Sequence, residues 1–352
     1  MNLDAIRTRI DKVDDQLLAL LEERMGLVHQ VGQLKQQSGG AIYRPEREKA
    51  ILERLKRHKG LLNGAAIEAI FLEIFAAARH LELPERIAFL GPEGSFTHQA
   101  AESRFGALGE YLSMNAISAV FKAVESGRAK YGIVPIENNT DGVVGETLDL
   151  LGEGSLSIVA EMMLPIHHAF ASRAEHIKEV KKVYSKDIAF GQCRDFFSEH
   201  MLENLERIPV ESTAKAARLA SEDPAAAAIC SHIAAKIYSL PVLFENIEDS
   251  HTNKTRFIVL SNYKNQPSGQ DKTTILAKTA NRPGALFEFL EEFNRAGINL
   301  TKIESRPSGE GEGFSSWFYI DFEGHCDDAA VKPILERHDD EIKWLGSYAR
   351  TC

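Results

Sequence analysis

Apolar residues return at alternating steps of four and three along the start of the chain, which is typical of one long amphipathic helix. The repeat consists of Ile6, Ile10, Val13, Leu17, Leu20, Leu27, Val31 and Leu34. At 1.5 Å per residue, a helix that continues to about Gln37 would be roughly 50 Å long, and Gly39-Gly40 would end it. Shorter helices are expected from Pro45 and from about Ala65 to Leu83. A segment this short with one helix this long cannot form a compact monomer, so the pattern predicts an intertwined helical dimer.

The pattern changes after Leu83-Pro84-Glu85, where short apolar runs alternate with helices. Strands are expected at residues 86–90, 131–136 and 255–260. Residues 261–271 have linker composition, and after them strands at 273–278, 299–305, 315–323 and 342–348 enclose helices at 285–296 and 329–338. The sequence therefore predicts a multidomain fold: an all-α domain at 1–84, an α/β domain at 86–262, and an α+β, ferredoxin-like domain at 272–352.

Composition excludes several classes of function. The 352 residues carry a net charge of −10, which argues against general binding to nucleic acid or to an anionic membrane. The four cysteines show no CxxC or zinc-type spacing, so we predict reduced thiols, no metal site and a cytoplasmic protein. The first residues show no signal-peptide pattern, and no apolar run approaches the ~20 residues that span a bilayer.

One cation interrupts the apolar repeat of the first helix. The step of four after Leu20 reaches Arg24, and a buried guanidinium is costly unless an anion meets it. Lys35 lies about 20° round the helix from Arg24, whereas Arg7 would need an antiparallel partner helix to reach the same ligand. Glu48 is expected to point inward from the second helix. Arg24 could simply pair with Glu48, but the convergence of several cations and inward carboxylates suggests a dicarboxylate site.

Residues 3–83 resemble the all-helical chorismate mutase family. The matching positions are Arg7, Ile10, Asp14, Leu17, Leu20-Leu21, Arg24, Val31-Gly32, Lys35 and Arg47-Glu48. The resemblance implies that Arg24 and the partner subunit's Arg7 bind the two carboxylates of chorismate, and that Lys35 contacts the ether oxygen and a carboxylate. It also implies that Glu48 binds the ring hydroxyl and that Arg47 supports the site. The rearrangement is intramolecular, so the site needs to hold the compact conformer and stabilise charge on the ether oxygen.

Three residues depart from this family pattern. Arg44 stands where many relatives have Asp, Ala78 replaces a common Ser, and Glu82 replaces a Gln that donates a hydrogen bond to the ether oxygen. Only a protonated Glu82 can donate, and apolar surroundings should raise its pKa. Mutase activity is therefore expected to fall as pH rises through the titration of Glu82. The departures leave open a helical domain that is weakly active or mainly structural.

Polar residues gather at the expected strand ends of the α/β domain. Gly91-Pro92-Glu93-Gly94-Ser95 forms a tight loop before a helix, a place that suits an anion. Glu137-Asn138 follow the strand at 131–136, and ligands bind at the carboxyl ends of strands in open α/β sheets. The other candidates are Ser185, Gln192-Cys193, Ser212-Thr213 and Thr255. Ordinary alternatives are that Ser212-Thr213 cap a helix, that Cys193 packs in a core, and that Thr255 only favours a strand.

This domain resembles prephenate dehydratase over its whole length. The matching motifs are Gly91-Pro92-Glu93-Gly94-Ser95-Phe96, Pro135-Ile136-Glu137-Asn138, Gln192-Cys193, Ser212-Thr213-Ala214 and Thr255-Arg256-Phe257. The resemblance implies two α/β subdomains that flank a cleft, as in periplasmic binding proteins, with Thr255 donating to the leaving hydroxyl of prephenate. The cleft lining would comprise Glu137, Asn138, Ser185, Gln192, Ser212, Thr213, Arg256 and Phe257, with Arg256 supporting charge or packing. Lys186-Asp187 replace the His-Pro of many relatives.

The C-terminal domain resembles an ACT domain of the phenylalanine-binding type. Gly284-Ala285-Leu286 match one motif, with Phe287 where Val is usual, and Glu304-Ser305-Arg306-Pro307 match the other. The resemblance implies that paired domains bind L-phenylalanine through Asn281, Gly284, Ala285, Leu286, Glu304, Ser305, Arg306 and Pro307. A dimerisation module without ligand binding is the alternative.

The domain order is that of the bifunctional chorismate mutase–prephenate dehydratase family. It implies conversion of chorismate to prephenate and then to phenylpyruvate in phenylalanine biosynthesis, with feedback inhibition by L-phenylalanine. It further implies a homodimer or higher oligomer and no cofactor. Two alternatives stay open: a dehydratase that prefers arogenate, and a non-catalytic amino-acid-sensing cleft protein, against which the intact Thr255-Arg256-Phe257 argues.

Overall fold

The computed structural model describes residues 2–38, 45–82, 85–140, 142–280, 282–307 and 316–351, without the side chains of residues 35–38, 82 and 316. The chain divides into two compact units, one formed by residues 1–85 with 105–110 and the other by residues 86–104 with 111–352. The expected all-α domain is therefore a unit of its own, whereas the expected α/β and α+β domains are parts of one unit.

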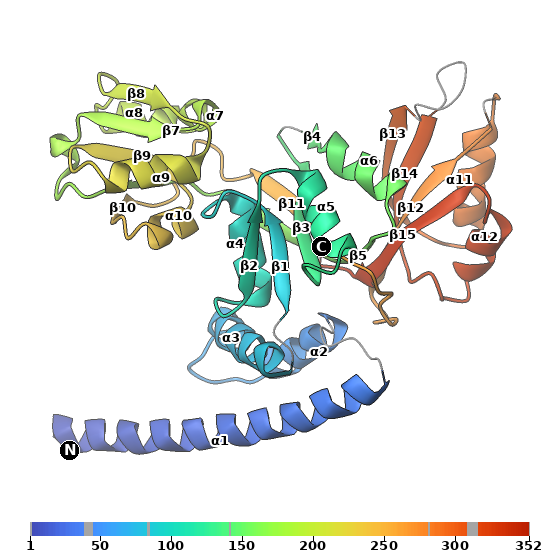
Figure 1. The fold of residues 1–352 in the computed structure, drawn as a ribbon, viewed down its shortest axis with the longest axis horizontal. Helices are drawn as coiled ribbons and strands as arrows, with labels where there is room; N and C mark the ends of the chain where they lie inside the picture. Colours follow the sequence, from blue (N-terminus) through green and yellow to red (C-terminus); the bar gives the residue numbers. More distant parts are fainter. Residues whose placement is uncertain are drawn as a thin grey trace. The chain divides into compact units, whose positions relative to one another are not determined.

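The helical unit consists of α1 (Leu3–Ser38), α2 (Pro45–Lys56) and α3 (Gly64–Glu82), with α1 as one long, gently curved helix (Figure 1). The expected starts and ends of the helices agree with these bounds to within about a residue. The part of α1 that is covered lies at Leu21, Arg24, Met25, Val28 and Gly32. The predicted apolar repeat lies beside that stripe and stays exposed, from 42% at Ile6 to 66% at Leu34.

The first sheet of the second unit has the strand order β2-β1-β3-β11-β5, with β4 paired to β3. Its elements are β1 (Arg86–Leu90), α4 (Phe96–Phe105), β2 (Glu110–Met114), α5 (Ile117–Glu125), β3 (Tyr131–Asn138), β4 (Gly142–Val143), α6 (Gly145–Glu153), β5 (Ser157–Pro165) and β11 (Lys254–Ser261). β3 runs two residues beyond the expected strand, so Glu137 and Asn138 are its last residues. β11 lies antiparallel between β3 and β5, which places Thr255 opposite Asn138.

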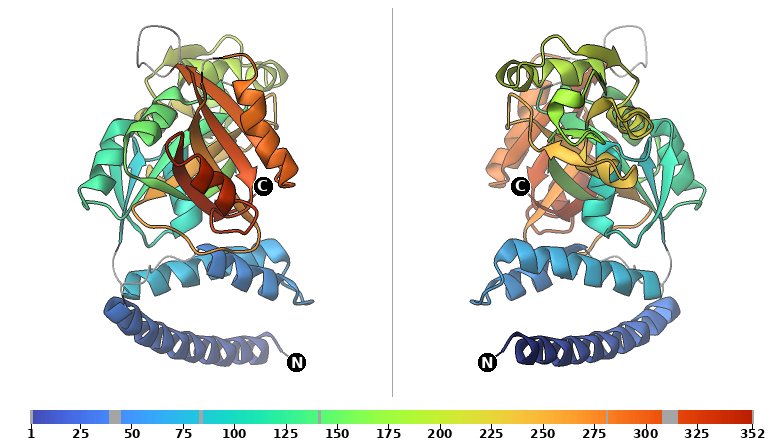
Figure 2. Two further views of the ribbon diagram at one scale, coloured as in Figure 1. Left: turned by 90° about the vertical axis from the view of Figure 1, so that its right-hand side faces the viewer. Right: turned by 90° about the vertical axis from the view of Figure 1, so that its left-hand side faces the viewer.

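The second sheet has the order β10-β6-β9-β7-β8 and forms a second subdomain (Figures 1 and 2). Its elements are β6 (Ala169–Ser172), η1 (Ile177–Glu179), β7 (Lys182–Ser185), α7 (Asp187–Gly191), α8 (Arg194–Glu199), β8 (Glu206–Pro209), α9 (Thr213–Ser221), β9 (Ala226–Cys230), α10 (His232–Ile237) and β10 (Val242–Phe244). The chain crosses between the two sheets twice, from β5 to β6 and from β10 to β11. This arrangement is the two-subdomain α/β fold expected from the sequence.

The third sheet has the order β13-β14-β12-β15, with α11 and α12 on one side of it (Figures 1 and 2). Its elements are β12 (Asp271–Lys278), α11 (Ala285–Arg295), β13 (Leu300–Pro307), β14 (Ser316–Glu323), α12 (Lys332–Arg337) and β15 (Ile342–Ala349). Phe289, Phe293 and Ile334 pack on one face. The other face shares a core with the first sheet and α6, through residues such as Leu276 and Tyr348.

The expected linker at residues 261–271 is a packed connection. The Asn265 side chain is buried and its Nδ2 donates to the carbonyl oxygens of Val159 and Ser347, at 2.8 and 2.9 Å. Close approach also fixes Gly346, because a Cβ there would lie 2.2 Å from the Ile158 carbonyl oxygen. β15 and β5 therefore meet backbone against backbone, which explains why the two expected domains form one unit. Among the described residues, no helix is both long and apolar enough to cross a membrane.

Candidate functional site

Arg24 of α1 has a buried side-chain nitrogen, Nη1, without a hydrogen-bond partner among the described residues. Its guanidinium carbon lies 5.7 Å from the centre of the Phe75 ring. Burial lowers the pKa of Arg24, Arg47 lowers it further, and Glu48 raises it. The charges of Arg47 and Glu48 are therefore close enough to Arg24 to change its pKa. A buried guanidinium nitrogen without a partner is a place where an anion would be stabilised.

Glu48 points inward, but its ion-pair partner is Arg79 of α3 rather than Arg24. Arg79 is itself buried, and its Nη2 donates to the carbonyl oxygen of Phe105 at 3.0 Å. The sequence analysis missed Arg79. The sequence held one indication that Arg79 is buried: it lies four residues after Phe75, on the same side of α3. Because Arg79 holds the carboxylate of Glu48, the Nη1 group of Arg24 stays open to a ligand.

The other expected residues of this site are not gathered by a single chain. Arg7 is 67% exposed and lies 3.8 Å from Asp4. It is about four turns from Leu21, where the partly buried section of α1 begins. Ala78 is buried in α3. The side chains of Lys35 and Glu82, and all of Arg44, lie outside the described residues.

Thr255 lies at the start of β11, nearly buried, with its hydroxyl oriented by the neighbouring strand. Asn138 Nδ2 donates to Thr255 Oγ1 at 2.7 Å and to Asn253 Oδ1 at 3.0 Å. Asn138 Oδ1 in turn accepts from the backbone N–H of Thr140 at 2.8 Å. Because Oγ1 accepts from Asn138, and no described residue accepts from Thr255, its hydroxyl hydrogen is left to donate to a ligand.

The adjacent residue, Arg256, faces the other side of the sheet. Its guanidinium contacts Glu161 Oε2 at 2.9 Å, Asp321 Oδ2 at 2.6 Å and the Tyr348 hydroxyl at 2.9 Å. Neighbouring residues of a strand point to opposite faces, and all three partners lie away from Thr255. The expectation that Arg256 lines the cleft is thereby corrected, whereas its expected role in charge or packing agrees with these contacts.

Two further cleft candidates are structural. Ser185 is fully buried and its Oγ donates to the Ile229 carbonyl oxygen at 3.0 Å, while Phe257 is fully buried in β11. Neither offers a group to a cleft ligand. Cys193 is a core residue, and burial raises the pKa of its thiol well above the usual range. The packing alternative for Cys193 is the one that the structure favours.

The Gly94 loop is the place where the two α/β subdomains touch. Gly94 has a φ of +82°, and a Cβ there would lie 3.1 Å from the Ala234 Cα and 3.2 Å from the Ala214 Cβ. Its carbonyl oxygen accepts from Ser231 Oγ at 2.6 Å. Ala214 follows Ser212-Thr213, and Ser212 caps α9 by accepting from Lys215 N. The expected Gly-loop and Ser-Thr motifs are therefore brought together across the two subdomains.

His168 is a residue that the sequence analysis missed. It is buried, its Nε2 lies 3.0 Å from Gln192 Oε1, and its ring packs edge-on against Phe96 of the first subdomain. Its Nδ1 is buried with no partner among the described residues. Burial lowers the pKa of His168, so the ring is neutral near pH 7 and Nδ1 is an acceptor. The only sequence signal was the His167-His168 pair after an apolar strand.

Two ion pairs connect the first sheet to the expected effector motifs. Glu137 Oε2 lies 2.6 Å from Lys302 Nζ on β13, and Arg306 pairs with Asp149 of α6 at 2.7 Å. Arg306 is thus engaged within its own chain, while Glu304, Ser305 and Pro307 lie along the same strand.

Gly284 precedes α11 with a φ of +85°. Ala285 is buried and Leu286 is half-buried, whereas Phe287 is exposed. Asn281 lies outside the described residues. The described residues of the expected effector site therefore lie in two places, at the start of α11 and along β13.

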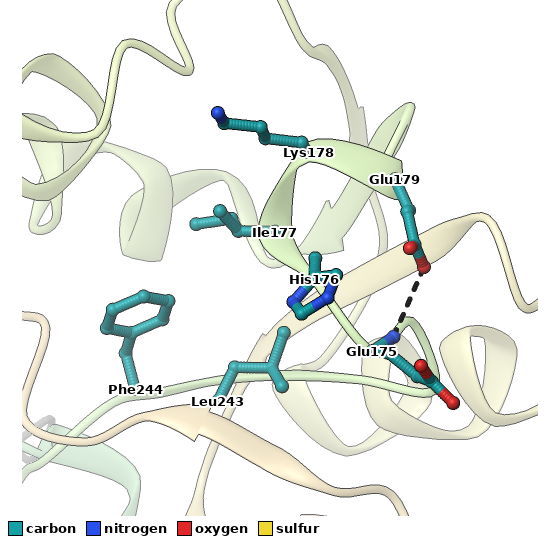
Figure 3. Close-up of a pocket in the computed structure, with 7 residues that line it drawn as sticks. All are labelled: Glu175, His176, Ile177, Lys178, Glu179, Leu243 and Phe244. Carbon is teal, nitrogen blue, oxygen red and sulfur yellow. Dashed lines mark hydrogen bonds between the residues drawn. The ribbon is translucent and has the colours of Figure 1, made fainter.

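A separate pocket of about 600 Å³ lies on the second subdomain, between η1 and β10 (Figure 3). It is lined by Glu175, His176, Ile177, Lys178, Glu179, Leu243 and Phe244. Figure 3 shows the apolar side chains of Ile177, Leu243 and Phe244 around one space. None of the expected site residues belongs to this lining.

Comparisons with known proteins decide the family. The sequence matches chorismate mutase type II over residues 6–83, prephenate dehydratase over 87–265 and the ACT domain over 273–340. It is 40% identical, over 356 residues, to the bifunctional chorismate mutase/prephenate dehydratase of Aquifex aeolicus, covering 99% of this chain and 98% of that protein. The chain belongs to the bifunctional chorismate mutase–prephenate dehydratase family.

Two solved structures resemble the second unit. The prephenate dehydratase of Arthrobacter aurescens in complex with L-Phe is 35% identical, with a TM-score of 0.67 over 75% of this chain and 90% of that chain. GqqA, described as a novel type of quorum quenching acylase, is 28% identical, with a TM-score of 0.68 over 76% of this chain and 98% of that chain. The fold thus carries more than one chemistry, and the helical unit that the family adds sets this chain apart from both.

Proposed function

We propose that the chain rearranges chorismate to prephenate in the helical unit and converts prephenate to phenylpyruvate between the two α/β subdomains, under feedback inhibition by L-phenylalanine. Family membership supports both activities. The observation that carries the dehydratase assignment is the hydroxyl of Thr255, held by Asn138 at 2.7 Å with its hydrogen left to donate.

In the mutase site, the open Nη1 group of Arg24 would take one carboxylate of chorismate. The partner subunit's Arg7 would take the other, because Arg7 of the same chain is exposed and lies roughly 25 Å along α1 from Arg24. Glu48, fixed by Arg79, would accept from the ring hydroxyl. Lys35 and a protonated Glu82 would stabilise the ether oxygen as its bond breaks. The site lowers the barrier by holding the compact conformer and by this charge stabilisation.

This mutase site requires a second copy of the chain. The exposed repeat of α1 would pack against the same repeat of an antiparallel α1. Burial of apolar area is worth about 25 cal/mol per Å², so a repeat of several half-exposed Leu, Ile and Val side chains favours association. The proposed homodimer thus supplies both the missing apolar contact and the missing cation.

In the dehydratase site, Thr255 would donate its hydrogen bond to the ring hydroxyl of prephenate. The bond from the ring to the carboxylate carbon breaks and its electrons enter the ring, while the C–O bond breaks with its electron pair on the hydroxyl oxygen. Carbon dioxide and hydroxide leave, and the hydroxide takes up a proton from solvent to become water. Aromatisation drives the step, so a neutral but positioned donor is sufficient. Gln192, Ser212 and Thr213 would complete the cleft from the second subdomain, with Asn138 from the first. Glu137 lies opposite Arg256 in the strand pair and contacts Lys302 of β13, so it faces away from Thr255 and is not kept in the cleft lining.

L-phenylalanine would bind at the start of α11 and along β13. The backbone N–H groups that follow Gly284 suit a carboxylate, and β13 is the edge strand of its sheet, open to a paired domain. The dehydratase from Arthrobacter aurescens was solved with L-Phe, which supports the same effector here. The Lys302–Glu137 pair links the effector strand β13 to β3 of the first sheet, and the Arg306–Asp149 pair links it to α6.

The test separates the two activities in the full-length chain. With chorismate, the wild-type chain should form phenylpyruvate, and L-phenylalanine should slow that step. Thr255→Val should lower dehydratase turnover by roughly 100-fold or more and accumulate prephenate, whereas Arg24→Met should stop chorismate consumption and still convert added prephenate. Supplying arogenate in parallel decides substrate preference. Phenylpyruvate formation at the wild-type rate by Thr255→Val would refute the assignment of the donor.

A further inference from the structure

Two histidines and a glutamate meet where the chain crosses between the two α/β subdomains. His167 lies on the crossover from β5 to β6, and Glu248 and His251 lie on the crossover from β10 to β11. Glu248 Oε1 is 2.6 Å from His167 Nδ1 and 3.2 Å from His251 Nδ1. The three atoms lie within 4.8 Å of one another.

The carboxylate is fixed and the histidines are accessible. The Glu248 side chain is only 3% exposed, and its other oxygen, Oε2, accepts from the backbone N–H of His168 at 2.9 Å. The His251 side chain is 68% exposed. Burial alone would raise the pKa of Glu248, but the hydrogen bonds from His167, from the His168 backbone N–H and from His251 lower it. The cluster therefore presents one ionised oxygen and two imidazole nitrogens to a shared point, with room for water on the side of His251.

We propose that His167, Glu248 and His251 bind a divalent transition-metal ion, such as Zn²⁺, that ties the two crossovers together. Two imidazoles and one carboxylate, with a water in the fourth position, form a donor set that zinc accepts at about 2.0–2.2 Å per bond. Such bonds place ligand atoms roughly 3–4 Å apart. The exposed His251 and half-exposed His167 can adjust to that spacing. The hydrogen bond that anchors Glu248 Oε2 is the support that a carboxylate ligand usually has.

Metal binding at this cluster requires a change of tautomer in both histidines. Both Nδ1 atoms now face an ionised carboxylate, so each carries a hydrogen. On binding the metal, each ring would move this hydrogen to Nε2, at no cost in net charge.

His325, Cys326 and Asp327 form a second group with comparable spacing of possible ligand atoms, but this group is less suited to bind a metal. His325 Nδ1 already accepts from the backbone N–H of Asp327 at 3.1 Å, and its Nε2 lies 3.2 Å from the Asn265 carbonyl oxygen. Its ring therefore has no free lone pair for a metal. The crossover cluster is the one that we assign.

The ion would restrain the dehydratase cleft, a consequence that rests on the proposed function. Both covalent connections between the subdomains pass through the cluster. Glu248 precedes Asp249, whose backbone N–H donates to the Gln192 carbonyl oxygen at 2.7 Å, and His251 lies four residues before Thr255. If the subdomains move about these crossovers during turnover, a bound ion should slow the dehydratase and leave the mutase unchanged.

The first experiment measures binding and needs no activity. Chelator-treated full-length chain is titrated with Zn²⁺ by calorimetry at pH 7.5. We expect the wild-type chain and a His176→Gln control to show a site that His251→Gln weakens by roughly tenfold or more. Asp327→Asn should leave this site intact. Titrations that coincide for the wild-type chain and His251→Gln would overturn the proposal, and because His251 is on the surface, misfolding would not explain a loss.

The second experiment measures both activities at saturating Zn²⁺. Dehydratase turnover should fall several-fold in the wild-type chain and in His176→Gln, should recover with chelator, and should not change in His251→Gln. Binding without any effect on the dehydratase would overturn the restraint and keep the site. A chain that binds zinc but forms no phenylpyruvate under any condition would instead count against the proposed function.

Discussion

Arg256 and three other buried charges join the catalytic sheet to the third sheet, and removal of one of them should be costly. Arg256 contacts Glu161 and Asp321, while Lys272 Nζ contacts Glu161 at 2.9 Å, and all four side chains are nearly fully buried. The group holds two cations and two anions, so it is balanced. Burial alone would lower the pKa of Arg256, but Tyr348, Asp321 and Glu161 outweigh it and raise the pKa, so the guanidinium stays charged at any working pH.

The cost follows from the charge that a substitution leaves behind. At a charge separation near 4 Å and an effective dielectric constant near 20, one such contact is worth about 4 kcal/mol. Breaking a buried pair by removal of one partner typically costs about 3–5 kcal/mol. Arg256→Met and Asp321→Leu should therefore each destabilise the unit by about 3–5 kcal/mol. The double variant leaves Lys272 and Glu161 as a balanced pair, so its cost should fall short of the sum by about 1–3 kcal/mol.

Tryptophan fluorescence in urea measures this directly, because both tryptophans, Trp317 and Trp344, lie in the third sheet. Lys254→Met is the matched control: it removes an exposed cation from the same strand and should change stability by less than about 0.5 kcal/mol. Arg256→Met should also lower dehydratase turnover by roughly 10- to 100-fold, because the segment of β11 that positions Thr255 loses the contacts of its neighbouring residue, with mutase turnover unchanged. Additive single and double variants, or an Arg256→Met midpoint equal to that of the wild-type chain, would refute the reasoning.

Three further predictions concern other elements. Glu82→Gln should flatten the fall of mutase turnover with rising pH, and an unchanged pH profile would contradict a protonated Glu82. Gly94→Ala should lower the free energy of unfolding by about 1–3 kcal/mol and raise the KM for prephenate, because the added Cβ would meet the backbone of α10. The control is Gly127→Ala, where φ is +71° and the space around the residue is open. It should lower the free energy of unfolding by about 1 kcal/mol and leave KM unchanged. Burial alone would lower the pKa of His338, but hydrogen bonds to two glutamates raise it. The free energy that protonated His338 contributes to folding should be fully present below about pH 6.5 and should be lost as pH rises through the higher pKa of the folded state. Thermal melts of His338→Gln should not show this loss.

Local patterns predicted the elements well, because helix and strand periodicity depend on residues three or four positions apart, or two. The bounds of α1, α2, α3 and β11 followed from apolar spacing, and the cap at Ser212 from residue type alone. Motif resemblance then supplied the family, which the comparisons confirmed.

Partners distant in sequence escaped this reasoning. Arg79 reaches Glu48 across 31 residues, His168 reaches Gln192 across 24, and Arg256 reaches Asp321 across 65. No periodic pattern encodes such pairs, and only the packing of the sheets brings them together. The proposed metal ligands escaped sequence reasoning for the same reason. Cysteine spacing predicted no metal site, and His167 and Glu248, 81 residues apart, meet only in the folded chain.

Two features of α1 make one argument about the assembly of the helical unit. A buried guanidinium nitrogen without a partner, at Arg24, destabilises the isolated unit, and so does a row of half-exposed Leu, Ile and Val side chains. Each would be relieved by a different partner: the first by an anion, the second by an apolar surface. In the proposed homodimer, an antiparallel copy of α1 would supply the apolar surface, and the partner subunit's Arg7 would supply a second cation that favours a doubly charged ligand. Substrate binding and dimer formation should therefore stabilise each other, and the Kd of the dimer should tighten when a dicarboxylate ligand is present.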